Sequence, residues 1–192
     1  MKTFASYALR CAGAVLAFAN LQAGEAYTFD QNHSRIGFEV RHLIGTARGQ
    51  FHRFTGTIDF DRQQPERSSV TAKIDVNSID TGIDERDNHL RSADFFNAAK
   101  FPQITFKSRS VRRTGDQAGD ITGDFTMHGV TRSIVLHVQL LESSESKTRW
   151  KVTTAPLKRK DFGLLFGGAA ETVSGIGQDV TVNIEIEARR GQ

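Results

Sequence analysis

The side chains in this sequence that could carry acid–base chemistry or bind a metal are its six histidines. No two of them have the His-x-x-x-His spacing that places two metal ligands on one helix face. His42 falls on the apolar side of an alternating run, which predicts an inward-pointing ring that either hydrogen-bonds to backbone or contacts the polar end of a ligand. His89 lies in a charged stretch, where it either faces solvent or contacts such a polar end.

The other four histidines have less specific surroundings. His33 precedes a strand and is a candidate capping residue, and His52 and His128 fit strand ends or turns. His137 lies on the opposite side of its strand from apolar neighbours, so we expect it in solvent. A metal-assisted enzyme using His42, His89 or His33 with nearby carboxylates would therefore need ligands that converge from distant parts of the chain. There is also no Gly-x-Ser-x-Gly element to indicate a nucleophilic serine.

The N-terminus has the pattern of a secretory signal peptide. Lys2 and Arg10 precede a short apolar run, and small residues allow cleavage after Ala23 or after Ala26. Small residues at both −3 and −1 favour Ala26, which divides the chain into a signal peptide at 1–26 and one domain at 27–192. Cys11 is the single cysteine, so the mature chain would have no disulfide or thiolate. This predicts an exported protein of the bacterial periplasm.

The charged residues argue against one class of partner, and the aromatic residues are mostly apolar rings. Lys and Arg number 25 against 22 Asp and Glu. They are interspersed, without a basic stripe among aromatic residues, which argues against nucleic acid as a partner. Fourteen Phe stand beside one Trp and two Tyr, so the chain supplies many apolar rings with few polar handles.

Most of the chain alternates apolar and polar residues with the period of a half-buried antiparallel strand. The expected strands are 35–42, 50–61, 68–76, 103–112, 121–127, 133–141, a strand around Trp150 and Val152, and 180–188. Strands with one apolar face must close or pair to bury that face. The sequence therefore predicts an all-β protein, an antiparallel eight-stranded β-barrel, with a β-sandwich as the alternative. In either, 180–188 is a candidate free edge for a homodimer.

One stretch interrupts this pattern. Thr81 followed by Asp84 fits a capped helix start with acid in the first turn. Pro102 prevents the helix from continuing. We therefore expect a short helical insertion over about 81–100 near one end of the barrel. It would either cover a pocket mouth or form a crossover whose Phe95 and Phe96 fill the core.

The interior could be hollow or packed. Eight strands leave room for side chains alone or for one small ligand. Small residues are expected at several inward positions, and they are a weak indication of a hollow interior: Gly56, Ala72, Ser108, Ser110 and Gly123. A packed barrel serving as an interaction module remains the alternative to a container.

Several ordered motifs resemble the YceI-like family of periplasmic proteins, over Tyr27 to about Ala188. They are His33-Ser34-x-Ile36-x-Phe38-x-Val40-x-His42, Thr81-Gly82 with Arg86-Asp87-x-His89-Leu90-Arg91-Ser92-x-Asp94-Phe95-Phe96, Phe101-Pro102-x-Ile104-x-Phe106-x-Ser108, Gly123-x-Phe125-Thr126-Met127-His128-Gly129-Val130-Thr131 and Arg159-x-Asp161-Phe162-Gly163. Asn97 departs from the pattern, because the family often has Asp there. The Gly-x-Trp signature of true lipocalins is absent.

The resemblance implies a lipocalin-like barrel that holds a long isoprenoid lipid, such as a polyprenyl chain or a quinone tail, or a similar amphiphile. It implies a non-catalytic carrier with no cofactor besides that ligand, acting in transport or stress response, with transient membrane contact and a homodimer both compatible. We expect the mouth near 83–96, with Arg86, His89 or Arg91 at the ligand's polar end. The expected ligand-binding residues are Phe38, Val40, His42, Phe54, Phe60, Arg86, His89, Leu90, Phe95, Phe96, Phe106, Phe125, Trp150 and Phe162.

Overall fold

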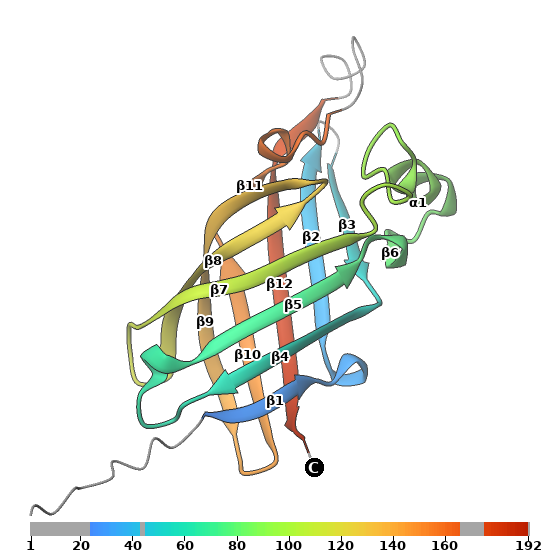
Figure 1. Cartoon of the computed structure of the whole chain (residues 1–192). Helices are drawn as coiled ribbons and strands as arrows, with labels where there is room; N and C mark the ends of the chain where they lie inside the picture. The colour runs from blue at the N-terminus through green and yellow to red at the C-terminus, as the bar shows by residue number, and fades with distance from the viewer. Residues whose placement is uncertain (1–23, 43–44, 166–174, 192) are drawn as a thin grey trace, which may run out of the picture.

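The computed structural model describes residues 24–42, 45–165 and 175–191. These residues form one antiparallel sheet of twelve strands, an α-helix and four short 3-10 helices (Figure 1). The strands are β1 (Glu25–Phe29), β2 (Arg35–His42), β3 (Gly45–Phe51), β4 (Phe54–Phe60), β5 (Ser69–Asp75), β6 (Ile79–Asp80), β7 (Gln103–Arg113), β8 (Ala118–Met127), β9 (Val130–Ser143), β10 (Lys147–Thr154), β11 (Leu157–Lys158) and β12 (Ile176–Arg190). The helices are α1 (Asp84–Arg91), η1 (Gln31–His33), η2 (Pro65–Arg67), η3 (Val76–Ser78) and η4 (Arg159–Phe162).

The sheet closes on itself. Its order runs β1-β4-β5-β7-β8-β9-β10-β12, and β12 pairs again with β1, which makes a ring of eight strands. Three further strands continue strands of this ring after a kink in the chain. β2 follows β1 after η1, and β6 follows β5 after η3. β3 precedes β4, with a break at His52–Arg53 between them. The predicted eight-stranded antiparallel barrel is therefore confirmed. The expected single strand over 50–61 is wrong, because the chain breaks at His52 and forms β3 and β4.

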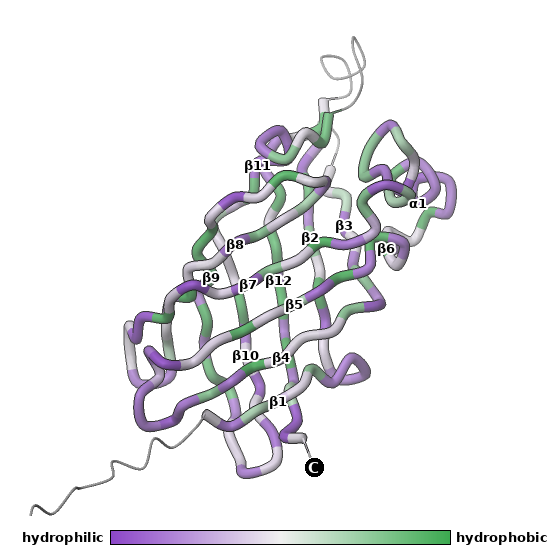
Figure 2. Tube along the Cα trace, viewed as in Figure 1, coloured by the Kyte–Doolittle hydropathy of each residue, from purple (hydrophilic) through white to green (hydrophobic). Residues whose placement is uncertain are grey.

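The apolar residues of the alternating strands face the inside of the barrel. The inward residues are those that line the interior, such as Ile134, Leu136 and Val138 of β9. Figure 2 shows the alternation itself as green and purple segments along the strands, with purple gathered in α1 and the turns. The expected free edge at 180–188 is wrong. β12 pairs with β10 on one side and with β2 and β1 on the other, so no backbone there is left for strand pairing with a second copy.

The helical insertion is present but differs in detail from the expectation. The helix is α1, and turns follow it to residue 100. Its N-cap is Ile83, without a side-chain cap, so Thr81 does not cap it. The Thr81 hydroxyl instead donates to Asp87 inside the helix at 2.5 Å. Phe95 and Phe96 are buried, as the second interpretation required, and both also line the barrel interior, which is compatible with the first.

Two local features of the wall follow from backbone geometry. His128 and Gly129 both have positive φ, 52° and 76°, which is the two-residue hairpin turn that matches the twist of its flanking strands. The pairing of β7 with β8 shifts register between Ser108 and Ser110. This irregularity leaves Ser110 exposed, so its expected inward position is wrong, and Val111 lines the interior instead.

Among the described residues, no helix is long and apolar enough to cross a bilayer. The predicted signal-peptide core lies outside the described residues. Glu25 and Ala26 are described and pair with Phe60 and Asp59 as the start of β1.

Candidate functional site

The barrel encloses a cavity of about 560 Å³. Its wall is mainly aliphatic and aromatic, with inward residues contributed by every strand of the ring of eight. Cavities of this size and character are typical of sites for small apolar ligands. The structure therefore contains an interior space of the kind that the container interpretation requires.

Twelve of the fourteen residues expected to bind a ligand line this cavity. They are Phe38, Val40, His42, Phe60, Arg86, His89, Leu90, Phe95, Phe96, Phe106, Phe125 and Trp150. Phe54 and Phe162 do not line it and are instead buried in the core around it, at 5% and 2% exposure. Phe162 supports the wall from behind, since its ring meets that of Phe125 edge to face at 5.4 Å.

The phenylalanines next to the insertion form a connected aromatic cluster. The Phe38 and Phe51 ring centroids lie 5.6 Å apart, those of Phe51 and Phe96 6.4 Å apart, and those of Phe95 and Phe96 5.2 Å apart. Edge-to-face and tilted contacts of this kind fix ring positions. The paired aromatics that follow α1 therefore anchor the insertion to the barrel wall.

Three cavity phenylalanines lie against glycines of the neighbouring strand. A Cβ on Gly56 would come within 2.3 Å of the Phe29 ring, one on Gly49 within 2.4 Å of Phe38, and one on Gly123 within 2.5 Å of Phe106. Each ring thus occupies space that any other residue's side chain would fill. These glycines let the rings lie close to the wall, which keeps the interior open.

Polar side chains of the insertion line the end of the cavity next to α1, and α1 lies near the top of the barrel in Figure 1. Thr81, Arg86 and His89, which we call the upper rim, all line the cavity. Arg86 donates from Nε to the Thr81 hydroxyl at 2.7 Å and from Nη2 to the Thr81 carbonyl at 2.8 Å. Arg86 and His89 also border a shallow surface hollow together with Glu85 and the exposed Ile83. The upper rim therefore separates the cavity from solvent. Arg91, the third expected head-group residue, instead bonds the Ile79 carbonyl and Asn88.

Arg159 is a cavity residue that the sequence argument missed as a site. Its guanidinium is buried at 2% exposure and donates to the carbonyls of Gly177 and Leu164 at 3.0 and 2.9 Å. These bonds join η4 to the start of β12 over one end of the cavity. Arg159 opens the Arg-x-Asp-Phe-Gly motif, which was the available signal. A buried Arg needs such carbonyl partners.

The remaining histidines lie outside the cavity lining. His52 bonds Asp80 at 2.7 Å and His137 bonds Asp120 at 2.7 Å, all at exposed or half-buried positions. The hydrogen bond from His52, with one from the Gly82 backbone, lowers the pKa of Asp80. The His128 ring contacts the Phe162 carbonyl at 3.1 Å. His42 and His89, the two singled out from the sequence, are thus the two histidines in the cavity wall.

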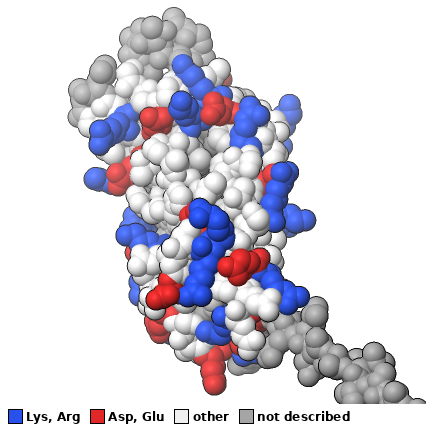
Figure 3. Space-filling view, turned by 90° about the vertical axis from the view of Figure 1, so that its left-hand side faces the viewer, with Lys and Arg blue, Asp and Glu red and all other residues white. Residues whose placement is uncertain are grey.

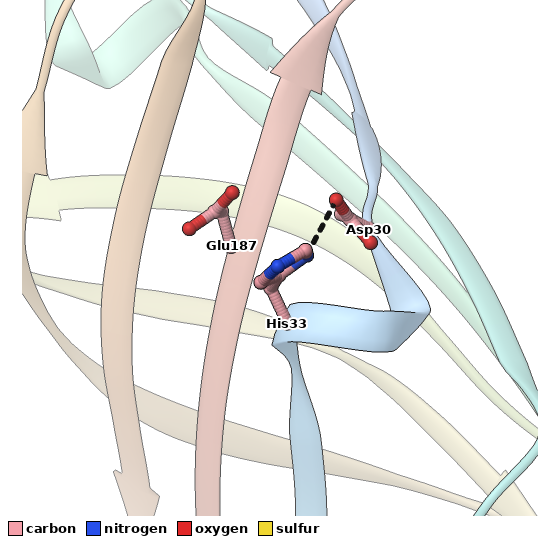
Figure 4. A group of neighbouring side chains, drawn as sticks. All are labelled: Asp30, His33 and Glu187. Atoms are coloured by element: carbon pink, nitrogen blue, oxygen red, sulfur yellow. Dashed lines mark hydrogen bonds and ion pairs between the residues drawn. The ribbon is translucent and has the colours of Figure 1, made fainter.

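His33 belongs to the one three-residue group that could hold a metal ion among the described residues, with Asp30 and Glu187 (Figure 4). Its Nδ1 lies 2.9 Å from Asp30. Arg189 already pairs with both carboxylates, at 2.6 Å to Asp30 and 3.0 Å to Glu187. Burial raises the pKa of Asp30, but hydrogen bonds from His33 and the Asn32 backbone outweigh it and lower that pKa. The group is a salt-bridge network.

Glu187 alternates with Ile186, which lines the cavity, so the network faces the other side of β12. It cannot act on a molecule inside the barrel. His42 and His89 do not belong to such a three-ligand group within the described chain.

Comparison with known proteins decides the family. The model of the YceI-like domain matches residues 27–188. The chain belongs to the YceI-like family. Protein YceI of Escherichia coli O6:H1 is 37% identical over 185 residues, covering 88% of this chain and 94% of that protein. Protein YceI of Salmonella agona is 38% identical over 169 residues, covering 84% of each.

Solved structures show the same fold. The Campylobacter jejuni YCEI protein has a TM-score of 0.70 and 30% identity, covering 79% of this chain and 90% of that one. Burkholderia cenocepacia BcnA has a TM-score of 0.76 at 22% identity, covering 83% and 98%. A polyisoprenoid binding domain from Saccharophagus degradans has a TM-score of 0.69 at 22% identity, covering 87% and 99%.

One position after α1 departs from the YceI-like pattern. Asn97, where the family often has Asp, adopts a left-handed conformation with φ of 47°. Asn and Asp are the non-glycine residues that tolerate this conformation best. The backbone nitrogen of Asn97 donates to the Ser92 carbonyl at 2.8 Å. The substitution therefore keeps the turn that follows α1.

Proposed function

We propose that this YceI-like protein is a periplasmic binding protein that carries a long isoprenoid lipid, or a similar amphiphile, inside its barrel and catalyses no reaction. The observation that carries the proposal is the apolar cavity of about 560 Å³, lined by twelve of the residues expected from the sequence. A packed interaction module would have this space filled by side chains. The Saccharophagus degradans domain, which shares the fold, is described as polyisoprenoid binding.

The cavity wall fits a methyl-branched hydrocarbon chain. Rings and aliphatic side chains offer dispersion contacts without polar groups that would need to be desolvated. Burial of each CH₂ from water is worth about 0.8 kcal/mol, so a long prenyl chain leaves water readily. A bilayer is equally apolar, so the free energy of transfer from membrane to barrel is small. A small transfer free energy suits a carrier that returns its ligand.

The polar end of the ligand belongs at the upper rim in this proposal. Arg86 and His89 line the cavity there and border solvent. An Arg–His pair donates hydrogen bonds to phosphate, hydroxyl or quinone oxygens. Transient contact of this end with a membrane would let the chain pass between bilayer and barrel.

Native mass spectrometry of the protein released from the periplasm without detergent, followed by organic extraction, tests the proposal. We expect a discrete adduct that fragments in steps of one isoprene unit. Incubation of emptied protein with a quinone and with a polyprenyl phosphate supplies the matched control. A bare mass that neither lipid changes would reject the carrier and favour an interaction module.

A further inference from the structure

The pairing between β5 and β7 ends before β7 itself does. Within the described chain, these strands pair from Asp75–Gln103 to Thr71–Lys107. β7 continues to Arg113, but its last residues pair with β8, up to Arg113–Gly119. The next donor on β5, the Val70 backbone nitrogen, bonds the side-chain hydroxyl of Ser108 at 2.9 Å. A side chain thus takes the place of a ladder carbonyl where the two strands part.

The cavity reaches the surface where these strands part. Residues of η2, the start of β5 and the β7–β8 turn line it there, and several are exposed. We call this group the lower rim, and its members are Pro65, Ser68, Ser69, Arg113, Gly115, Asp116 and Gln117. The face that carries the β7–β8 turn has Lys and Arg interspersed with Asp and Glu (Figure 3). The lower rim is therefore polar, as the upper rim is.

The floor of the barrel beside this opening is closed. Arg62 donates to Glu25 at 2.9 Å, to the Tyr27 hydroxyl at 2.6 Å and to the Ser144 carbonyl at 2.6 Å. It also bonds the Ser143 hydroxyl. These contacts join the β4–β5 loop to β1 and to the β9–β10 hairpin. The 3-10 helix η2 packs against β7 where the pairing with β5 ends. The lower opening is therefore lateral, between η2 and the β7–β8 turn.

The two rims lie at opposite ends of β7 (Figure 1). β7 begins next to the insertion that carries the upper rim and ends at Arg113 in the lower rim. Ten residue steps at about 3.4 Å each separate its ends by about 34 Å. Apolar residues line the cavity between the rims, including Ile104, Phe106 and Val111 of β7 itself.

We propose that the lower rim is a second mouth, so that the barrel is a tunnel open at both rims and accepts isoprenoid chains longer than its own span. This inference rests on the proposed isoprenoid-binding function. The polar head group stays at the upper rim, and the far end of a long chain passes out between Ser69 and the β7–β8 turn. The ligand class then extends to long-chain polyprenols and their derivatives.

A tunnel and a blind cavity respond differently to chain length. In both, each added CH₂ contributes burial until the interior is full. In a tunnel, carbons beyond that point extend past the lower rim, and affinity becomes constant. In a blind cavity, the extra carbons must fold back into occupied space, and overpacking lowers affinity.

The test is to close the lower rim with a bulky side chain and compare a short with a long ligand. Gln117→Trp and Gly115→Trp each place an indole at the rim, and Gln117 is in phase with the cavity-lining Gly119 and Ile121. Gly115 has no positive φ, and a Cβ there makes only an ordinary 3.6 Å contact with Ala118. Lys73→Trp is the matched control, because Lys73 is exposed on the same strand and does not line the cavity. Retention of farnesol and of solanesol is measured for emptied full-length mature protein loaded from phosphatidylcholine vesicles.

We expect the three variants to retain farnesol as the wild type does, which also shows that they fold. Gln117→Trp and Gly115→Trp should retain solanesol at least tenfold less well, and Lys73→Trp should retain it normally. Equal retention of solanesol by rim variants and wild type would overturn the second mouth while leaving the carrier function intact. A wild type that retains neither alcohol would instead reject the carrier function itself.

Discussion

Asp87 accepts two hydrogen bonds from Thr81, at 3.0 Å from its backbone nitrogen and at 2.5 Å from its hydroxyl. Asp87 is 5% exposed, and it is the buried residue of an otherwise polar helix. A helix without an apolar face gains little from packing. The Asp87–Thr81 contact therefore holds α1 on the end of β6, and Arg86 reinforces it through the same threonine.

The first prediction concerns this contact. Asp87→Asn places an amide NH₂ next to the two Thr81 donors and removes the negative charge that these donors stabilise. The change should weaken the attachment of α1 by about 1–3 kcal/mol. We expect faster amide hydrogen exchange over residues 81–91 with little change in β8 and β9. Asp84→Asn, at an exposed position of the same helix, serves as the control. Unchanged exchange in Asp87→Asn would mean that other contacts hold the helix.

The second prediction concerns head-group recognition at the upper rim. His89→Ala should weaken retention of farnesyl phosphate roughly tenfold or more, because a charge-assisted hydrogen bond contributes about 1.5–3 kcal/mol. Retention of farnesol, which has the same chain, should change much less. Arg86→Ala should add to this loss and also loosen α1. The control is Arg48→Ala, since Arg48 is exposed and pairs with Glu39 away from the cavity. Equal losses for both ligands would show a packing effect.

The third prediction concerns the glycines that hold cavity rings close to the wall. Gly56→Ala should push the Phe29 ring inward, reduce the amount of lipid bound and lower the free energy of unfolding by about 1–3 kcal/mol. Gly37→Ala is the control, because its Cβ would make an ordinary 3.4 Å contact with the Asn183 carbonyl. Urea titration and extracted lipid per protein measure the two effects. If Gly56→Ala binds as much lipid as the wild type, the glycine does not set the cavity's width.

The barrel was predictable because alternation is a local signal. In runs such as Ile134, Leu136 and Val138 on β9, every second side chain faces the same side of the sheet, and in a closed barrel that side is the interior. The kinks at His52 and η3 were missed although the apolar pattern changes phase at both. The buried pairs Phe51/Phe54 and Val76/Ile79 are each three residues apart, whereas one continuous strand requires an even spacing. The closing pair of β1 with β12 joins the two ends of the domain, and no local pattern encodes it.

The cavity was only partly predictable for the same reason. Phe106 and Phe125 could be placed inward from alternation, and both line it. Whether the inward rings fill or surround the space depends on how close each lies to the wall, which the cross-strand glycines decide. Phe54 and Phe162 share the pattern but lie behind the lining. The position of Arg159 in the cavity wall was not predicted, because a charged residue before a Gly-rich stretch is normally expected at the surface.

The fourth prediction concerns the mature N-terminus. Residue patterns favour cleavage after Ala26, but Glu25 and Ala26 pair with β4, and Glu25 bonds Arg62 at 2.9 Å. Cleavage after Ala23 keeps this first part of β1. We therefore expect the mature protein to begin at Gly24. N-terminal sequencing or intact mass of the exported protein measures it, and a chain beginning at Tyr27 would contradict it.

The fifth prediction is a pH dependence of stability that comes from the barrel floor. The hydrogen bond from the Tyr27 hydroxyl, followed by that from Arg62, lowers the pKa of Glu25. Burial, with the hydrogen bond to Glu25, raises the pKa of Tyr27, so the phenol stays a donor. Because the pKa of Glu25 is lower in the folded than in the unfolded state, its stabilisation is complete above the unfolded value of about 4.3 and is lost as pH falls through the folded value.

Removing this carboxylate should therefore remove part of the acid sensitivity. We expect the urea midpoint of the protein beginning at Gly24 to fall more between about pH 6 and about pH 3 than that of Glu25→Gln. Glu66→Gln controls for the general loss of negative charge, because the Glu66 side chain is exposed and lies outside the Glu25–Tyr27–Arg62 contact. It should follow the wild type. A Glu25→Gln midpoint that falls as steeply as that of the wild type would show that the floor contact carries no charge-dependent stability.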